Sequence, residues 1–379
     1  VIRLGSDFIE LDPDTHKLTR PTALAATNGA YVLNTVEDFA KLAITWHTNG
    51  YYSMVDGVTE NNLNGVQSST ITVNDTIDLS GTGLTGFTQD RADNSQVFSG
   101  TLNGNGAINL AIGEPYGVRE KNDTSNGNGK IYRHGRLGLF AAVNGATISN
   151  VAIAGSMKFD NQSNVDAGAL AGVKVGGDTS LTATTFSAGI EYESTNKDNY
   201  VHVGSVFGSM SGAGSLTIGS REASSVINAK IDSNTQERGA TCVGGAVGYV
   251  SGDCVPSASG KTVEVDGLTI SGSIAIKNGS VKTYAGGFIG KISQGKLDSG
   301  VLSSVKQVKI TKLDFSKLSL STAGANASNS AGLLGYSWAG AEVTLGDDSV
   351  NKDGSYAITT SGSSVSSATA TEFGGLVYA

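Results

Sequence analysis

The sequence predicts an all-β chain that forms a right-handed parallel β-helix with a short capping helix near its N-terminus. Three observations lead to this fold class. Glycine supplies 52 of the 379 residues, about twice its usual share. A five-residue phrase recurs every 30 to 45 residues, and between its copies apolar residues alternate with small polar ones. Repeats of that length are typical of solenoids, propellers and arrays.

Composition excludes several other classes of protein. Charged residues make up only 16% of the chain, and glycine is a poor helix former, so a helical enzyme is not expected. With 4 prolines and no glycine at every third position, the chain is not collagen. The net charge is −8 and the densest basic stretch is Lys130 to Arg136, so we expect no nucleic-acid partner. No apolar run is long enough to span a membrane.

The repeated phrase consists of a small residue, any residue, two apolar residues and a second small residue. Its copies begin at Gly138, Gly168, Gly204, Gly244, Gly286 and Ala331, with an incomplete copy at Gly374. We expect the two apolar residues to join an interior stack. Glycine is expected where a strand bends tightly or where the backbone of the next coil comes close.

The segments between the phrases predict about three short strands in each repeat, for example at 146–154, 263–270 and 305–313. A propeller blade would need four hairpin-linked strands, and only Val143 to Ala146 carries a clear two-residue hairpin turn. One repeat is therefore interpreted as one coil. The β-helix is predicted over residues 67–379, with regular coils from about 137 and seven to ten coils in all.

The first 66 residues are predicted to form an N-terminal segment with a helix over about 35–48. Thr35 is a good N-cap with Asp38 three positions later, and an apolar stripe follows. Such a helix would cover the open apolar end of a solenoid, although packing on the side of the coils is an alternative. Strands are expected next at 69–73, 76–79, 97–102 and 107–110.

The order of these features resembles that of bacterial surface proteins with GLUG-type repeats. The resemblance rests on the helix around Glu37 to Ala43, on Phe98 to Gly106, and on phrases such as Gly287-Phe288-Ile289-Gly290. It covers about residues 35–379. It implies a pectate-lyase-like right-handed β-helix on a secreted or wall-anchored protein, often an adhesin, and it transfers no catalytic residue to this chain.

Two cysteines, Cys242 and Cys254, flank the copy of the phrase at Gly244. In an extracellular protein, a pair twelve positions apart can form a disulfide that constrains one coil, and we predict this bond. Two buried free thiols are the alternative. No histidine lies close enough in sequence to complete a zinc site.

No catalytic, cofactor-binding or metal-ligating set is predicted. The four histidines, His16, His47, His134 and His202, lie in separate segments, and no hydrolase or nucleotide-binding motif occurs. A β-helix can carry polysaccharide-cleaving carboxylates, so a carbohydrate lyase or hydrolase remains an alternative. Asp78 is better explained as a turn residue that hydrogen-bonds the backbone.

The longest break in the repeat, about 81–130, is interpreted as a long loop that binds a ligand. Its Phe87 and Tyr116 could stack on sugar rings, with Arg91 and Arg119 nearby. A flexible insertion without function is the alternative. Asp-rich turns there could also bind Ca²⁺, although no calcium-loop motif occurs.

These observations lead to an expected role as an extracellular, non-enzymatic stalk or adhesin-like module that presents loops to a glycan or to a host or cell surface. A self-assembling subunit of a surface layer or filament is a further alternative. The last copy of the phrase breaks off at Tyr378-Ala379. We therefore also expect an end-to-end contact through the C-terminal coil, or a longer parent chain.

Overall fold

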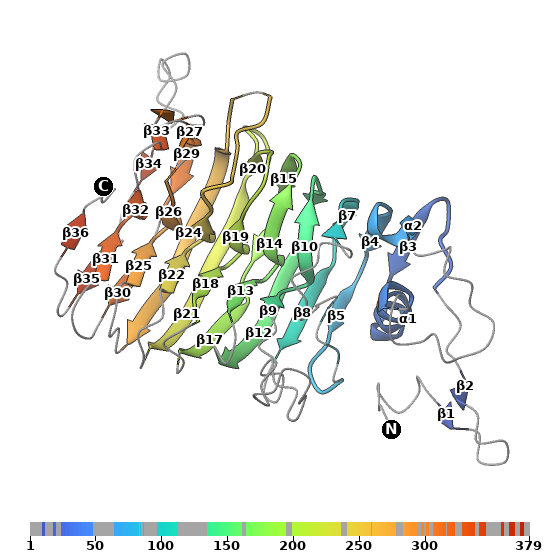
Figure 1. Ribbon diagram of the computed structural model, residues 1–379. Helices are drawn as coiled ribbons and strands as arrows, with labels where there is room; N and C mark the ends of the chain where they lie inside the picture. The colour runs from blue at the N-terminus through green and yellow to red at the C-terminus, as the bar shows by residue number, and fades with distance from the viewer. Residues whose placement is uncertain are drawn as a thin grey trace, which may run out of the picture.

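The fold was analysed in a computed structural model. The structure describes residues 10–11, 18–19, 24–47, 64–82, 84, 86, 97–112, 135–160, 164–194, 199–235, 241–258, 260–277, 283–294, 297–298, 301–302, 306–315, 317–322, 328–337, 341–345, 358–359, 364–367 and 372–374. Three all-parallel sheets dominate it, and their strands stack coil upon coil along one axis (Figure 1). The predicted parallel β-helix is confirmed.

Sheets 1 and 2 are short-stranded and contain seven strands each. Sheet 1 consists of β9 (Gly135–Leu137), β13 (Val165–Gly168), β18 (Val201–Gly204), β22 (Thr241–Gly244), β25 (Thr283–Gly286), β31 (Ser328–Ala331) and β36 (Glu372–Gly374). Sheet 2 consists of β6 (Val97–Phe98), β10 (Phe140–Asn144), β14 (Ala171–Gly176), β19 (Phe207–Met210), β23 (Val247–Val250), β26 (Ile289–Ile292) and β32 (Leu334–Ser337).

Sheet 3 contains 18 strands and forms the long wall of the solenoid. Its strands are β3 (Ala30–Leu33), β4 (Thr70–Val73), β5 (Thr76–Asp78), β7 (Thr101–Gly104), β8 (Ala107–Ile112), β11 (Thr147–Ser149), β12 (Ala152–Asp160), β15 (Thr179–Thr182), β16 (Thr185–Phe186), β17 (Gly189–Ser194), β20 (Leu216–Ile218), β21 (Ser225–Thr235), β24 (Val263–Lys277), β29 (Lys306–Asp314), β30 (Leu318–Thr322), β33 (Ala341–Leu345), β34 (Ile358–Thr359) and β35 (Ser364–Ser367).

Each regular coil runs from sheet 1 through the repeated phrase to sheet 2, and then along sheet 3. The strands of successive coils pair in parallel, so equivalent residues form ladders. One interior ladder on sheet 3 is buried over seven successive strands, at Ile71, Leu102, Ile148, Leu181, Ile218, Val265 and Ile310. Because no coil can bury such a ladder alone, each coil depends on its neighbours.

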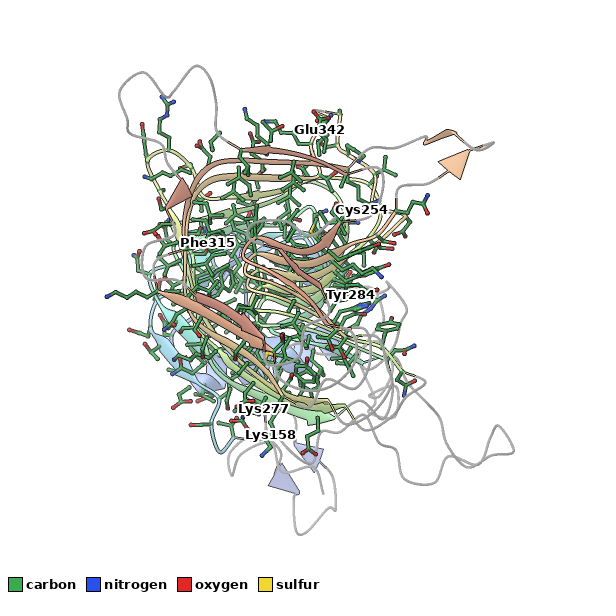
Figure 2. All side chains as sticks on the ribbon, turned by 90° about the vertical axis from the view of Figure 1, so that its left-hand side faces the viewer. Lys158, Cys254, Lys277, Tyr284, Phe315 and Glu342 are labelled. Carbon is green, nitrogen blue, oxygen red and sulfur yellow. The ribbon has the colours of Figure 1, made fainter. Side chains whose placement is uncertain are left out.

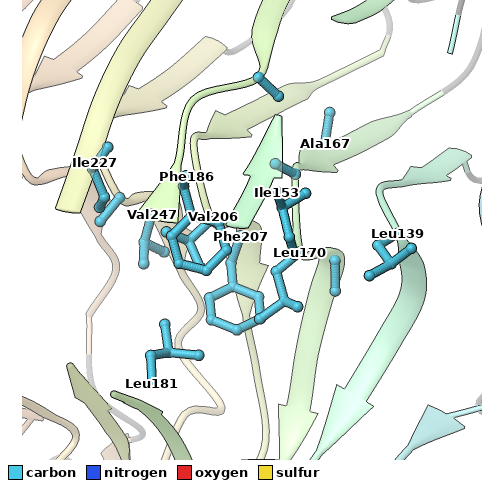
Figure 3. Close-up of a cluster of buried hydrophobic side chains, with 14 of the residues drawn as sticks. Leu139, Ile153, Ala167, Leu170, Leu181, Phe186, Val206, Phe207, Ile227 and Val247 are labelled. Carbon is cyan, nitrogen blue, oxygen red and sulfur yellow. The ribbon is translucent and has the colours of Figure 1, made fainter. Parts of the chain in front are cut away.

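The two apolar residues of the phrase lie in this core, as predicted. Leu170, Val206, Phe207 and Val247 are fully buried and pack beside side chains of sheet 3 such as Phe186 (Figure 3). The phrase therefore places two buried side chains where the chain turns from sheet 1 to sheet 2.

The predicted capping helix is α1 (Val36–His47), which lies at the N-terminal end of the stack beside β3 and β5 (Figure 1). Its capping box is present. The Thr35 hydroxyl accepts a hydrogen bond from the Asp38 amide at 3.1 Å, and Asp38 accepts one from the Thr35 amide at 3.1 Å. Phe39 and Leu42 are fully buried and join the core cluster, so the helix covers the end of the solenoid.

Two boundaries differ from those that the sequence predicts. Strand β3 pairs in parallel with β4, so the first strand of sheet 3 lies before residue 67. The predicted loop at 81–130 is too wide, because the strands also expected at 97–102 and 107–110 are present as β6, β7 and β8 and continue sheets 2 and 3. Apolar positions such as Phe98, Leu102 and Ile108 explain this, since each is buried in the core.

The remaining elements are short. The single-turn helix α2 (Asn64–Gln67) precedes β4 and was not predicted. Two antiparallel pairs lie apart from the main sheets: β1 (Glu10–Leu11) with β2 (Leu18–Thr19), and β27 (Leu297–Asp298) with β28 (Val301–Leu302). In the part of the chain that the structure describes, no helix is long and apolar enough to cross a membrane.

Candidate functional site

The last glycine of the repeated phrase lets sheet 2 approach sheet 1 very closely. A Cβ atom built on Gly248, in β23, would lie 2.5 Å from the Val203 amide nitrogen and 2.6 Å from the Gly208 carbonyl oxygen. Gly290, in β26, faces the Val243 backbone at 2.6 Å in the same way. Only glycine leaves room for such an approach of two backbones, so the phrase folds the outer faces of sheets 1 and 2 toward each other.

The outer faces of these two sheets carry polar and aromatic side chains in ladders. Side chains alternate between the two faces of a strand, and in sheet 1 the core takes Val201, Val203 and Val243. The opposite face of sheet 1 carries a ladder that runs in register from Arg136 to Glu372, and Asp166, His202, Cys242 and Tyr284 are four consecutive members of it. The facing ladder of sheet 2 carries Ser209, Tyr249, Lys291 and Tyr336. We call these eight residues the seam.

The seam lies on the side of the molecule where sheets 1 and 2 meet. Viewed along the stack, Tyr284 lies on this side, across the section from Phe315 on the inner face of the long wall (Figure 2). Asp166 and Cys242 are buried at the base, whereas Tyr249, Tyr284, Lys291 and Tyr336 are half-buried. The half-buried side chains therefore form the part of the seam that a ligand can reach.

At the base of the seam, His202 is held in one orientation. Its Nδ1 atom lies 2.8 Å from Oδ1 of Asp166, and its ring stacks on Tyr200 with the centroids 4.3 Å apart and on Tyr249 at 4.4 Å. Burial raises the pKa of the Tyr200 phenol, and the Asp166 carboxylate raises it further. The stack consequently presents neutral phenols on either side of the imidazole.

Further along the seam, a lysine lies between two tyrosines. The Nζ atom of Lys291 is 4.2 Å from the centre of the Tyr284 ring and 5.8 Å from that of Tyr336, and the two rings are themselves 5.1 Å apart. Both distances fall within the range of cation–π attraction. This arrangement holds an ammonium group and two aromatic faces at one half-buried position.

The predicted disulfide between Cys242 and Cys254 is wrong, because both are buried free thiols. Cys254 belongs to the core cluster, whereas Cys242 lies on the outer face of sheet 1, so β23 and its turn separate the two side chains. Burial raises the pKa of Cys242 to about 12 and that of Cys254 to about 11. A thiol with so high a pKa is a poor nucleophile, although Asp166, His202 and Cys242 follow one another in the ladder.

The expected turn role of Asp78 is confirmed, since its carboxylate accepts a hydrogen bond from the Ser80 amide at 3.0 Å, which lowers the pKa of Asp78. Among the residues that the structure describes, no group of three or more His, Cys, Asp or Glu side chains is placed to hold a metal ion. The predicted loop residues Phe87, Arg91, Tyr116 and Arg119 lie outside the described residues. Their role in binding stays a prediction.

Sequence reasoning missed the seam, although the phrase itself carries a signal for it. Seam residues of sheet 1 stand two positions before the first residue of a phrase, as His202 does before Gly204 and Tyr284 before Gly286. Seam residues of sheet 2 directly follow its last glycine, as Tyr249 follows Gly248. Taking the residue at each of these two positions in every repeat would have identified both ladders.

Comparisons with protein-family models, with curated proteins and with solved structures find no significant match.

Proposed function

We propose that this chain is an extracellular, non-enzymatic, adhesin-like module of a bacterial surface protein and that it binds a glycan polymer along the seam. The observation that carries this proposal is the row of half-buried tyrosines at Tyr249, Tyr284 and Tyr336 on a rigid solenoid. Aromatic faces stack on the C–H faces of sugar rings, and a row of them along a repeating scaffold suits a repeating ligand. The resemblance to GLUG-repeat surface proteins supports the extracellular and adhesive part.

The seam is better suited to holding a ligand than to cleaving one. Glycoside cleavage generally requires two carboxyl groups on either side of the scissile bond. The acidic residues of the sheet 1 ladder are Asp166, which is buried and engaged by His202, and Glu372, which stands five strands further along and so cannot flank the same bond. The Cys242 thiol is buried and its pKa is raised. These features support binding in preference to catalysis.

A glycan array tests the proposal. We expect the wild-type chain to bind a subset of polysaccharides and the double variant Tyr249→Ala/Tyr336→Ala to lose that binding while keeping its circular dichroism spectrum. Val226→Ala is a suitable control, because Val226 is an exposed apolar residue on the outer face of sheet 3. Release of reducing or unsaturated sugars would support the lyase or hydrolase alternative. Unchanged array binding by the double variant would contradict the role of the seam.

A further inference from the structure

We propose that the corner between sheets 2 and 3 binds a small monovalent anion such as chloride, held by the Lys174 ammonium group and the Thr179 hydroxyl. The inference goes beyond glycan binding, because both side chains point into the core and neither belongs to the seam. It depends on three features of this corner: the direction of the two side chains, the hydrogen bonds that they lack, and the charges around them.

The two side chains approach each other from opposite sides of a short bend. Lys174, in β14, pairs with the buried Val143 and Met210, so it points into the core from sheet 2. Thr179, the first residue of β15, pairs with the buried Leu216, so it points into the core from sheet 3. Only four residues separate the two along the chain. Because the chain turns the corner between them, both side chains enter the same part of the interior.

Both groups are buried with fewer hydrogen bonds than they can form. Lys174 is 0% exposed and Thr179 is 1% exposed. The Lys174 ammonium donates to the Gly176 carbonyl oxygen at 3.2 Å, which uses one of its three donors. The Thr179 Oγ1 atom has no hydrogen-bond partner among the residues that the structure describes. Since buried polar groups are rarely left unsatisfied, we expect a bound species that accepts a hydrogen bond from each of them.

The charge at this corner favours an anion over a neutral ligand. Burial lowers the pKa of Lys174, and the nearby Cys254 and Asp178 oppose this only in part. Asp178 is exposed, and its carboxylate accepts hydrogen bonds from the Ser215 amide and hydroxyl. The Cys254 thiol is neutral at pH 7, because burial raises its pKa to about 11. An ammonium group without a buried counter-charge is costly in a core, and one monovalent anion neutralises it.

The position of the site suits a small ion. The bend that covers it contains Gly176 and Gly177, which have no side chains, and Asp178 beyond them is exposed. A local opening of this bend would admit a single ion, whereas a sugar or a phosphate ester would need several strands to separate.

A second buried lysine at the same corner provides a comparison. Lys306, three coils further along, donates to the Gly252 carbonyl oxygen at 3.4 Å. The Thr262 hydroxyl of that region is satisfied, since it accepts a hydrogen bond from the Gln307 amide at 3.2 Å. The combination of a buried ammonium and an unpartnered hydroxyl is therefore specific to Lys174 and Thr179 within the described part of this corner.

Urea unfolding of the full chain in sodium chloride and in sodium fluoride tests the proposal. The two salts have equal ionic strength at equal concentration, and fluoride gives up its hydration water much less readily. Both salts also act on the whole protein surface, so the measured quantity is the stability of wild type relative to each variant in each salt. Above its Kd, each tenfold rise in chloride should increase the folding equilibrium constant of wild type by up to about tenfold relative to a variant without the site.

Three substitutions in the site and one beside it make the test specific. Thr179→Val replaces the hydroxyl by a methyl group, and Lys174→Met removes the charge. We expect both to lose the chloride response, so chloride should narrow the stability difference between wild type and Lys174→Met. Thr179→Ser keeps the hydroxyl and should keep the response. Lys306→Met removes a buried charge at the same corner and should also keep it.

Anomalous scattering from crystals soaked in bromide locates the ion directly, and we expect a peak between Lys174 Nζ and Thr179 Oγ1. A wild type without a chloride response, or a response that survives in both Thr179→Val and Lys174→Met, would overturn the proposal. Density for a water molecule without an anomalous signal at this position would also overturn it, because a neutral ligand would then satisfy the two groups. Each of these outcomes leaves glycan binding by the seam unaffected.

Discussion

A methyl group added at Gly248 should destabilise the solenoid strongly, whereas the same methyl at Gly189 should not. The Cβ of Gly248→Ala would lie 2.5 and 2.7 Å from the Val203 backbone nitrogen and oxygen and 2.6 Å from the Gly208 carbonyl oxygen. Ordinary van der Waals contacts begin near 3.4 Å. Backbone atoms of two hydrogen-bonded strands would therefore have to move by almost 1 Å, and they cannot rotate away as a side chain can.

The size of the effect follows from packing energetics. Overpacking of a core costs about 1–3 kcal/mol, and a clash with fixed backbone belongs at the upper end, so Gly248→Ala should lose about 3 kcal/mol. At Gly189, in β17, the nearest atom to the added Cβ is the Gly155 carbonyl oxygen at 3.9 Å. Gly189→Ala should be neutral or gain up to about 1 kcal/mol, because alanine reduces the entropy of the unfolded chain.

Urea unfolding followed by circular dichroism measures both variants against wild type. We expect the midpoint of Gly248→Ala to fall clearly and that of Gly189→Ala to stay or rise slightly. Similar midpoints for the two variants would refute the close approach of sheets 1 and 2, and with it the geometry of the seam.

Three further predictions concern buried and ionisable groups. Lys174 is fully buried in a ladder between Val143 and Met210, and burial lowers its pKa. Lys174→Met should therefore raise the free energy of unfolding at pH 7 by about 1–4 kcal/mol, which urea unfolding measures. Because the pKa of Lys174 is lower in the folded state, the unfolded chain binds more protons and the stability of wild type rises with pH. The stability difference between Lys174→Met and wild type should therefore shrink as the pH approaches about 10.5. Urea unfolding at pH 7, 9 and 10.5 measures this difference. Cys242 and Cys254 should react with a thiol reagent only after denaturation, and reducing agents should leave the melting temperature unchanged; fast labelling of the native chain would contradict their burial. The Asp178 carboxylate accepts hydrogen bonds from the Ser215 amide and hydroxyl, which lower its pKa, so it stabilises the fold above its unfolded pKa and this contribution is lost as pH falls. Asp178→Ala should therefore melt lower than wild type at pH 7 by an amount that disappears in acid, and an equal difference at both pH values would count against the hydrogen bonds as the cause.

Much of the fold could be predicted because the forces that specify it are local or periodic. The capping box at Thr35 and Asp38 is visible within four residues, and the structure confirms it. The repeated phrase is visible because every coil must supply the same bend and the same buried pair, as at Val206 and Phe207. These features need no knowledge of which coil lies beside which.

The seam could not be predicted in the same way because it depends on register between coils. Tyr249, Lys291 and Tyr336 are 42 and 45 residues apart in sequence and meet only when the intervening loops of unequal length close in one particular register. The first copy of the phrase shows how easily register is lost: Gly138 aligns with Gly168, but Phe140 pairs with Ala171, one position further on.

The predicted disulfide failed for a related reason. A separation of twelve positions is compatible with a disulfide, but the sequence does not show that Cys242 lies on the outer face of sheet 1 and Cys254 in the core. Inserting or deleting one residue in the bend between them would have moved the side chain after the bend to the other face of its strand. Spacing alone therefore carries little weight where the chain turns sharply between two sheets.

A crystal structure of the chain with the oligosaccharide that binds best on the glycan array tests the central claim most directly. We predict sugar rings stacked on Tyr249 and Tyr336, with the oligosaccharide running parallel to the axis past Lys291. An oligosaccharide bound to the outer face of sheet 3, or held only by the segments around Phe87 and Tyr116, would contradict the assignment of the seam as the binding surface.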